Sequence, residues 1–114
     1  MDKIVPKFGE IYRCKIGFTN LTGSKNRPAI IISSKEYNSS RDDVIVASIT
    51  SKTPESEDLG FEIVDLQLAG LLKQSYIKPV IFTLHKLLIF DKLGELSQND
   101  LPKLKDMLSR SIIL

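Results

Sequence analysis

Hydrophobic and polar residues alternate along the chain in short runs that turn-forming residues interrupt. In the first run, EIYRCKI, the residues Tyr12, Cys14 and Ile16 fall on one side and the charged residues between them on the other, which is the period of a β-strand. The same pattern predicts further strands at residues 29–33, 44–50, 59–65 and 75–84. Pro79 cannot donate a ladder hydrogen bond, so it places the middle of the fifth strand at a sheet edge or in a bulge.

Apolar residues at helical spacing appear in the second half of the chain. The segment LQLAGLLKQ predicts one helical turn that ends near Gly70. Near the end of the chain, a stripe at helical spacing is formed by Leu101, Leu104, Leu108 and Ile112. Ser97 is the expected N-cap, and Pro102 fits only near the first turn, so this helix should begin between Ser97 and Asp100. Together the elements predict a mainly β fold, a small antiparallel barrel with a short helix and a C-terminal helix.

The composition bounds the class of protein. A length of 114 residues fits one domain, residues 1–114, with a core that needs no covalent staple. The one cysteine, Cys14, excludes an internal disulfide and a multi-cysteine metal site, and it fits a reducing compartment. There is no signal-peptide pattern, and no apolar run approaches the roughly 18 residues of a membrane-spanning helix. We therefore expect a cytoplasmic protein with no membrane partner.

The charges are distributed unevenly along the chain. Residues 1–41 carry eight Lys or Arg and three acidic residues, whereas residues 42–70 carry one Lys and seven acidic residues. Residues 71–114 are again basic, with seven Lys or Arg and four acidic residues. Most of these charges belong on a solvated surface. The two basic parts around an acidic middle would also suit a phosphate-binding surface beside an acidic rim.

Few residues offer catalytic chemistry. Glycine-rich phosphate loops and metal-spaced His/Cys sets do not occur in the sequence, so no cofactor and no metal site are expected. His85 is the only histidine and is interpreted as a surface or half-buried residue, while Cys14 lies on the inward face as a core residue. Gly60 and Gly94 are interpreted as turn glycines. The remaining candidates are polar residues at strand ends, namely Arg27, Thr50, Ser51, Ser75 and Lys78.

Three segments resemble, in order and spacing, the MazF/PemK (Kid) family of toxin endoribonucleases: FGEIYRCKIGFTNLTGSKNRPAIIISS, VIVASITS and LKQSYIKPVIFTLHKLLIFDKLGELS. The family pattern has Gly-Glu before an alternating strand, Arg-Pro before an apolar strand, and Thr-Ser at the end of the next strand. A Ser-x-x-(Arg/Lys) segment follows, and an LG.LS motif precedes the terminal helix. The resemblance covers nearly the whole chain.

The resemblance implies an SH3-like barrel of the MazF/CcdB type, a homodimer, and an RNA site between the subunits. It implies cleavage of single-stranded RNA without metal, in which the 2′-hydroxyl attacks phosphorus to give a 2′,3′-cyclic phosphate and a 5′-hydroxyl. A cognate acidic antitoxin is the expected protein partner, and operator DNA is expected to be bound only by the toxin–antitoxin complex.

Matching the motifs residue by residue assigns catalysis to Arg27 and Thr50. Arg27 would hold the scissile phosphate, and Thr50 would fix the phosphate or the attacking ribose. RNA binding is expected from Lys25, Asn26, Ser51, Ser75 and Lys78. Lys25 would act from a mobile loop over the groove, residues 17–26. The motifs identify no general base.

Other interpretations of the same residues stay open. Arg27 could form a salt bridge with Glu10 or Asp43, and Thr50 and Ser51 could have a capping or turn role. Many family members have arginine where this chain has Lys78, and many have proline where it has Ser48. A non-catalytic dimeric binding module is the alternative function, either a silent relative or a gyrase poison of the same fold. The gyrase poisons need a C-terminal tryptophan, and this chain contains no tryptophan.

Overall fold

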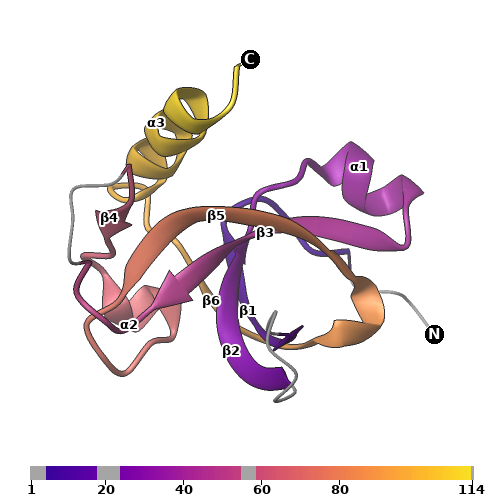
Figure 1. Ribbon diagram of the computed structural model, residues 1–114, viewed down its shortest axis with the longest axis horizontal. Helices are drawn as coiled ribbons and strands as arrows, with labels where there is room; N and C mark the ends of the chain where they lie inside the picture. The colour runs from indigo at the N-terminus through magenta and orange to yellow at the C-terminus, as the bar shows by residue number, and fades with distance from the viewer. Residues whose placement is uncertain (1–4, 18–23, 55–58, 114) are drawn as a thin grey trace.

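A six-stranded antiparallel sheet dominates the computed structural model, which describes residues 5–17, 24–54 and 59–113 (Figure 1). The strands run in the order β4-β5-β3-β2-β1-β6 across the sheet. Their bounds are β1 Glu10–Gly17, β2 Ser24–Ile31, β3 Asp43–Thr50, β4 Phe61–Glu62, β5 Tyr76–His85 and β6 Ile89–Glu95. The helices are α1 Lys35–Ser40, α2 Leu66–Ala69, the 3-10 turn Lys86–Leu88 and α3 Leu101–Ser111. The predicted mainly β class with a short helix and a C-terminal helix is confirmed.

Several local predictions need correction. The sheet has a sixth strand, β6, which pairs with β1 and which the polar and glycine residues in its sequence concealed. No helix was expected at residues 35–43, but this segment contains α1, whose N-cap Ser34 accepts a hydrogen bond from the Tyr37 N–H at 3.1 Å. The predicted strand 59–65 is reduced to the two residues of β4. Gly94 lies within β6 and is no turn glycine.

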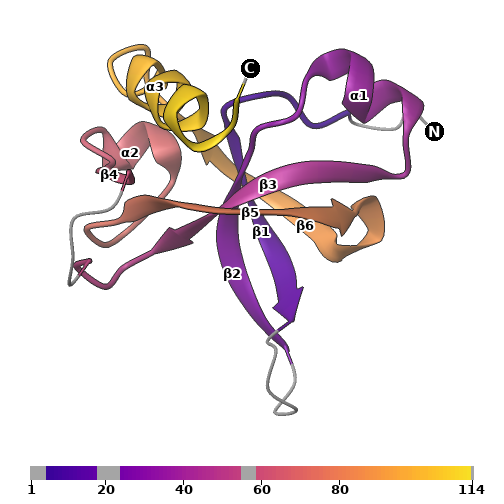
Figure 2. The same ribbon diagram turned by 45° about the horizontal axis from the view of Figure 1, so that its top comes forward.

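The sheet buries residues on both faces because it is strongly curved (Figures 1 and 2). One face packs against α2, β4 and α3 through a core that includes Ile30, Ile63, Leu104 and Met107. The other face encloses a second core that includes Cys14, Ile31 and Val46. Strand β2 supplies residues to both cores, with Ala29, Ile30 and Ile31 fully buried, as predicted for this apolar run. Within the described residues, no helix is long and apolar enough to cross a membrane.

The C-terminal helix begins one residue later than predicted, with Asp100 at the N-cap position and Pro102 in the first turn. Ser97 is not the N-cap, but its hydroxyl accepts a hydrogen bond from the Asp100 N–H at 3.2 Å in the turn just before the helix. Leu104 and Met107 are buried, and Leu101 and Leu108 pack beside them, so these three leucines of the predicted stripe face the core as expected. Ile112 does not belong to the stripe, because it follows the end of the helix and is exposed.

The buried carboxylate of Asp100 joins α3 to the segment that leads into α2. It accepts hydrogen bonds from the backbone N–H groups of Val64 and Asp65, both at 3.1 Å, and it pairs with the Lys103 ammonium at 3.1 Å. Burial acts to raise the pKa of Asp100, but these donors outweigh it, so the pKa lies below its ordinary value. The Asp65 carboxylate in turn accepts from the Leu68 N–H at 3.1 Å and caps α2.

We predict that Asp100→Asn lowers the free energy of unfolding at neutral pH by about 1–3 kcal/mol, because it removes the charge that these hydrogen bonds stabilise. Since folding lowers the pKa of Asp100, its contribution is complete above the unfolded value of about 4 and is lost as the pH falls through the folded value. Urea unfolding at pH 7 and below pH 4 should therefore show a difference between parent and variant that shrinks in acid. Asp106→Asn, on the exposed face of α3, is the matched control; a difference that does not change with pH would contradict this role.

Candidate active site

The site begins where β2 and β3 stop pairing. Their ladder runs through Ile31, Ile30 and Ala29 and ends at the pair Ala29–Ser48. The Ile32 N–H donates to the Ile45 carbonyl at 2.9 Å, so by the alternation of an antiparallel ladder every second residue of β2 directs its N–H toward β3. Pro28 is the next residue in that series and has no N–H. The ladder therefore lacks a donor at Pro28, and the two strands separate.

Beyond this point each strand continues with another partner. β2 remains paired with β1 as far as Ser24, and β3 remains paired with β5 as far as Thr50. Continuing the register of the β2–β3 ladder by two residues would place Arg27 opposite Thr50. The two residues assigned to catalysis thus occupy matching positions on the two strands that separate.

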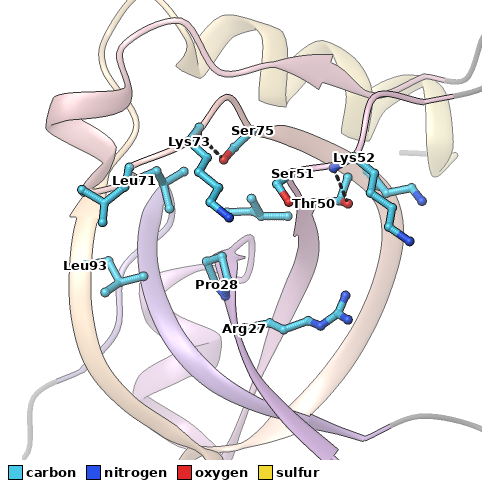
Figure 3. Close-up of a pocket in the computed structure, with 13 residues that line it drawn as sticks. Arg27, Pro28, Thr50, Ser51, Lys52, Leu71, Lys73, Ser75 and Leu93 are labelled. Carbon is cyan, nitrogen blue, oxygen red and sulfur yellow. Dashed lines mark hydrogen bonds between the residues drawn. The ribbon is translucent and has the colours of Figure 1, made fainter.

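A pocket of about 630 Å³ occupies the gap between the separated strands (Figure 3). It is bounded by the ends of β2 and β3, the segment that follows α2, and single residues of β5 and β6. The residues that line it are Arg27, Pro28, Ile49, Thr50, Ser51, Lys52, Gly70, Leu71, Leu72, Lys73, Ser75, Lys78 and Leu93. Among these described residues four are Lys or Arg and none is acidic, so the pocket favours an anion.

Five of the seven predicted site residues line this pocket, namely Arg27, Thr50, Ser51, Ser75 and Lys78. The other two do not. Lys25 and Asn26 are exposed on β2, where they pair with Ile16 and Lys15 of β1, so they belong to a strand and not to the predicted loop 17–26. Gly17 and Ser24, at the ends of β1 and β2, are likewise paired, and residues 18–23 of the predicted loop lie outside the described residues.

Thr50 and Ser75 differ in how their hydroxyl groups are used. The Thr50 hydroxyl accepts a hydrogen bond from the Lys52 N–H at 3.1 Å, so the turn role considered from the sequence is present. A hydroxyl that accepts one bond still has its own proton to donate, so Thr50 can also act on a ligand. The Ser75 hydroxyl is buried and donates to the Lys73 carbonyl at 2.8 Å. Ser75 therefore offers a ligand only its acceptor lone pairs while this bond is made.

A bulge in β5 places Lys78. Ala47 of β3 pairs with Ile81, but Ile49 pairs with Ile77, so three residues of β5 stand opposite one residue of β3. Lys78 and Pro79 lie in this bulge, as the proline predicted. β4 pairs only with Tyr76 and Ile77, so no described strand pairs with Pro79 on the side away from β3, and the predicted sheet edge is present as well. The extra residues re-aim the strand, and Lys78 lines the pocket.

The two acids considered as partners of Arg27 bind other residues. Glu10 pairs with the Lys92 ammonium at 2.8 Å. Burial acts to raise the pKa of Glu10, but hydrogen bonds from Lys92, the Lys7 N–H and the Tyr12 hydroxyl outweigh burial, so the pKa is lowered. Asp43 pairs with Arg41 at 2.7 Å, and this bond lowers the pKa of Asp43.

Neither His85 nor Cys14 belongs to the pocket, as the sequence indicated. His85 is exposed, and its Nδ1 accepts a hydrogen bond from the Leu87 N–H at 3.0 Å. Cys14 is fully buried, and burial raises the pKa of its thiol to about 12, so the thiolate form is suppressed at neutral pH. In the parts of the chain that the structure describes, no group of three or more His, Cys, Asp or Glu side chains could hold a metal ion.

The segment after α2 forms a side of the pocket that the sequence did not reveal. Gly70 ends α2 in the left-handed region at φ 73°, and its N–H and that of Leu71 bond back to the last turn of the helix. Figure 3 shows Leu71 and Lys73 on this side of the pocket and Leu93 of β6 beside them. No local motif marks these residues, because their place depends on how α2 packs against β6.

Comparison with known proteins agrees with the fold. Residues 7–112 match the family described as "PemK-like, MazF-like toxin of type II toxin-antitoxin system". The search of curated proteins found no significant match. Similar solved structures include an endoribonuclease from Mycobacterial species, with 24% identity, a TM-score of 0.72, and coverage of 95% of this chain and 91% of the other. An endoribonuclease in complex with its cognate antitoxin, also from Mycobacterial species, has 24% identity, a TM-score of 0.73, and coverage of 96% and 94%.

MazF from Deinococcus radiodurans has 18% identity, a TM-score of 0.72, and coverage of 95% of this chain and 96% of the other. At these identities the structural matches establish the fold. The family match spans most of the chain. The protein therefore belongs to the PemK-like, MazF-like toxins of type II toxin–antitoxin systems.

We predict that Gly94→Ala disrupts the pocket through α2. A Cβ at Gly94 would lie 2.3 Å from the Leu68 carbonyl oxygen and 2.4 Å from the Ala69 carbonyl carbon, so the helix must move. Overpacking of this kind typically costs about 1–3 kcal/mol. Thermal unfolding should show a lower Tm for Gly94→Ala than for the control Gly17→Ala, since a Cβ at Gly17 meets nothing within 4 Å. Equal Tm values for the two variants would show that α2 is not seated as described.

Proposed function

We propose that this chain is a toxin endoribonuclease that cleaves single-stranded RNA without metal. The observation that carries the proposal is the pocket at the end of the β2–β3 ladder, which combines Arg27 and Thr50 with further cations. A polyanionic substrate suits this charge. The family match and the fold shared with solved endoribonucleases support the same activity.

In the proposed reaction the 2′-oxygen of the substrate attacks the adjacent phosphorus while the bond from phosphorus to the 5′-oxygen breaks. The 2′-hydroxyl loses a proton and the departing 5′-oxygen gains one, so the products are a 2′,3′-cyclic phosphate and a 5′-hydroxyl. No water is consumed and no electrons are transferred. The step needs charge stabilisation at phosphorus and correct alignment of the 2′-oxygen, which positioned side chains can supply.

Arg27 provides the charge stabilisation in this scheme. Its guanidinium donates in a planar arrangement that matches two phosphate oxygens at once. Arg27 lies on β2 just before the fully buried residues 29–31, so its backbone is held in place. Thr50 orients the phosphate or the ribose through its hydroxyl, while Ser51 and Lys78 bind the substrate from the adjoining sides of the pocket.

The same site accounts for the expected partners. We infer that the protein acts as a homodimer and is inhibited by an acidic antitoxin that competes with RNA. One of the structural relatives is an endoribonuclease solved with its cognate antitoxin. A flexible acidic segment would be attracted by the same cations that bind RNA.

The decisive experiment incubates the purified protein with a mixed-sequence single-stranded RNA in EDTA. Cleavage at a short motif, with 5′ ends that polynucleotide kinase labels directly and 3′ ends that resist phosphatase until acid opens a cyclic phosphate, supports the proposal. RNA of varied sequence that remains uncut would instead favour a non-catalytic binding module on the same fold.

We predict that Arg27→Ala lowers the cleavage rate by about 10²–10³-fold, the usual cost of one charge-stabilising donor, without loss of Tm. Arg27→Lys should recover little activity, because lysine is a point charge and lacks the planar pair of donors. Single-turnover cleavage rates measure both effects. An Arg27→Ala variant that cuts as fast as the parent would exclude the assigned role.

We also predict that Lys78→Glu and Lys25→Glu each weaken binding of RNA and of the antitoxin. Because both ligands would use the same cations, raising the salt concentration should weaken both in parallel. Binding titrations across a salt series, with and without competing RNA, measure this. An antitoxin that binds with full affinity while RNA still reacts at the site would contradict a shared surface.

A further inference from the structure

Lys73 lies in the pocket, yet no motif points to it. Figure 3 shows its side chain extending into the pocket from the segment after α2, on the side opposite Arg27. It is separated from Arg27 by more than forty residues of sequence, so only the fold brings them to the same pocket.

The backbone that carries Lys73 is held at several points. The Leu71 N–H donates to the Leu66 carbonyl at 3.0 Å at the end of α2. The Gln74 side chain donates to the Glu62 carboxylate at 2.7 Å, and the Ile63 N–H donates to the Ser75 carbonyl at 2.9 Å. The Ser75 hydroxyl donates to the carbonyl of Lys73 itself. The position from which the lysine extends is therefore fixed on both sides of the residue.

The Lys73 ammonium is not neutralised by a neighbouring acid. In the described part of the chain, no carboxylate lies within ion-pair distance of it, and the nearby Glu62 is hydrogen-bonded to Gln74. Lys73 is exposed, and its side chain extends into a pocket that is already cationic and that Leu71 and Leu93 also line. A cation held there by the fold is stabilised when an anion enters the pocket.

We propose that Lys73 is a substrate-binding residue that contacts a phosphate next to the cleaved one. The proposal rests on the proposed function. Arg27 on one side of the pocket takes the scissile phosphate, and single-stranded RNA carries a further phosphate at every nucleotide. Lys73 on the opposite side is placed to hold one of the two flanking phosphates, which sets the direction of the strand across the pocket.

The test is a cycle between the protein charge and the RNA charge. A short RNA centred on the mapped cut site is made with a 2′-deoxy nucleotide at that site, so that it binds without reacting. Two further versions carry an uncharged methylphosphonate at the 5′ or the 3′ flanking phosphate. Affinities of the parent, Lys73→Ala and the control Lys35→Ala, an exposed lysine of α1 away from the pocket, are measured across a salt series.

Lys73→Ala should weaken binding about two- to fivefold, the range for an exposed ion pair, and should lower the salt slope by about 0.7. One methylphosphonate should weaken the parent and Lys35→Ala but leave Lys73→Ala unaffected. The proposal about Lys73 is overturned if Lys73→Ala has the same salt slope as the parent, or if both methylphosphonates still weaken its binding. If the parent nevertheless cuts RNA, the proposed function stands. A parent that binds RNA but does not cut it would overturn the proposed function and, with it, the assignment of Lys73 to a phosphate next to the cleaved one. A parent that neither binds nor cuts RNA overturns both.

Discussion

The end of the hydrogen-bond ladder between β2 and β3 is the constraint on which the site depends. Ala29, Ile30 and Ile31 of β2 are fully buried and pair with β3, and Ala29 and Ile30 also pair with β1, which holds the strand in place. At Pro28 the donor that would face β3 is missing, and the strands separate with their outer partners still attached. Strand β2 therefore loses its pairing with β3 but keeps its pairing with β1. Arg27, one residue before Pro28, is paired with Cys14 of β1 but is beyond the end of the ladder with β3, so it lies at the open side of the strand.

A second constraint closes the other side of the pocket. The backbone of α2 lies so close to β6 that neither Gly70 nor Gly94 has room for a Cβ, which would lie 1.9 Å from the Leu93 oxygen and 2.3 Å from the Leu68 oxygen respectively. The carboxylate of Asp100 holds the entry to α2 from the other end. Two backbone contacts and one buried charge thus position a short helix that has little stability of its own.

The charge of the pocket follows from where these constraints meet. Cations from β2, from the turn after β3, from the segment after α2 and from the bulge of β5 line one pocket, although they are scattered over half of the sequence. Each would be an ordinary solvated residue in isolation. Gathered together without an acid among the described lining residues, they repel one another, and an anionic ligand relieves that repulsion.

The resemblance to a known family, and not a local pattern, singled out Arg27 and Thr50. The sequence by itself determined the strands with a clear two-residue period, the leucine stripe of α3 and the irregularity at Pro79. These features depend on local periodicity and on the covalent chemistry of proline, which each segment carries with it. Only the tertiary structure decided that β6 is a strand, that Gly94 is a packing contact and that Lys73 enters the pocket. Strand pairing and helix packing join residues far apart in the chain, and the free energy of such contacts leaves no periodic mark on either partner.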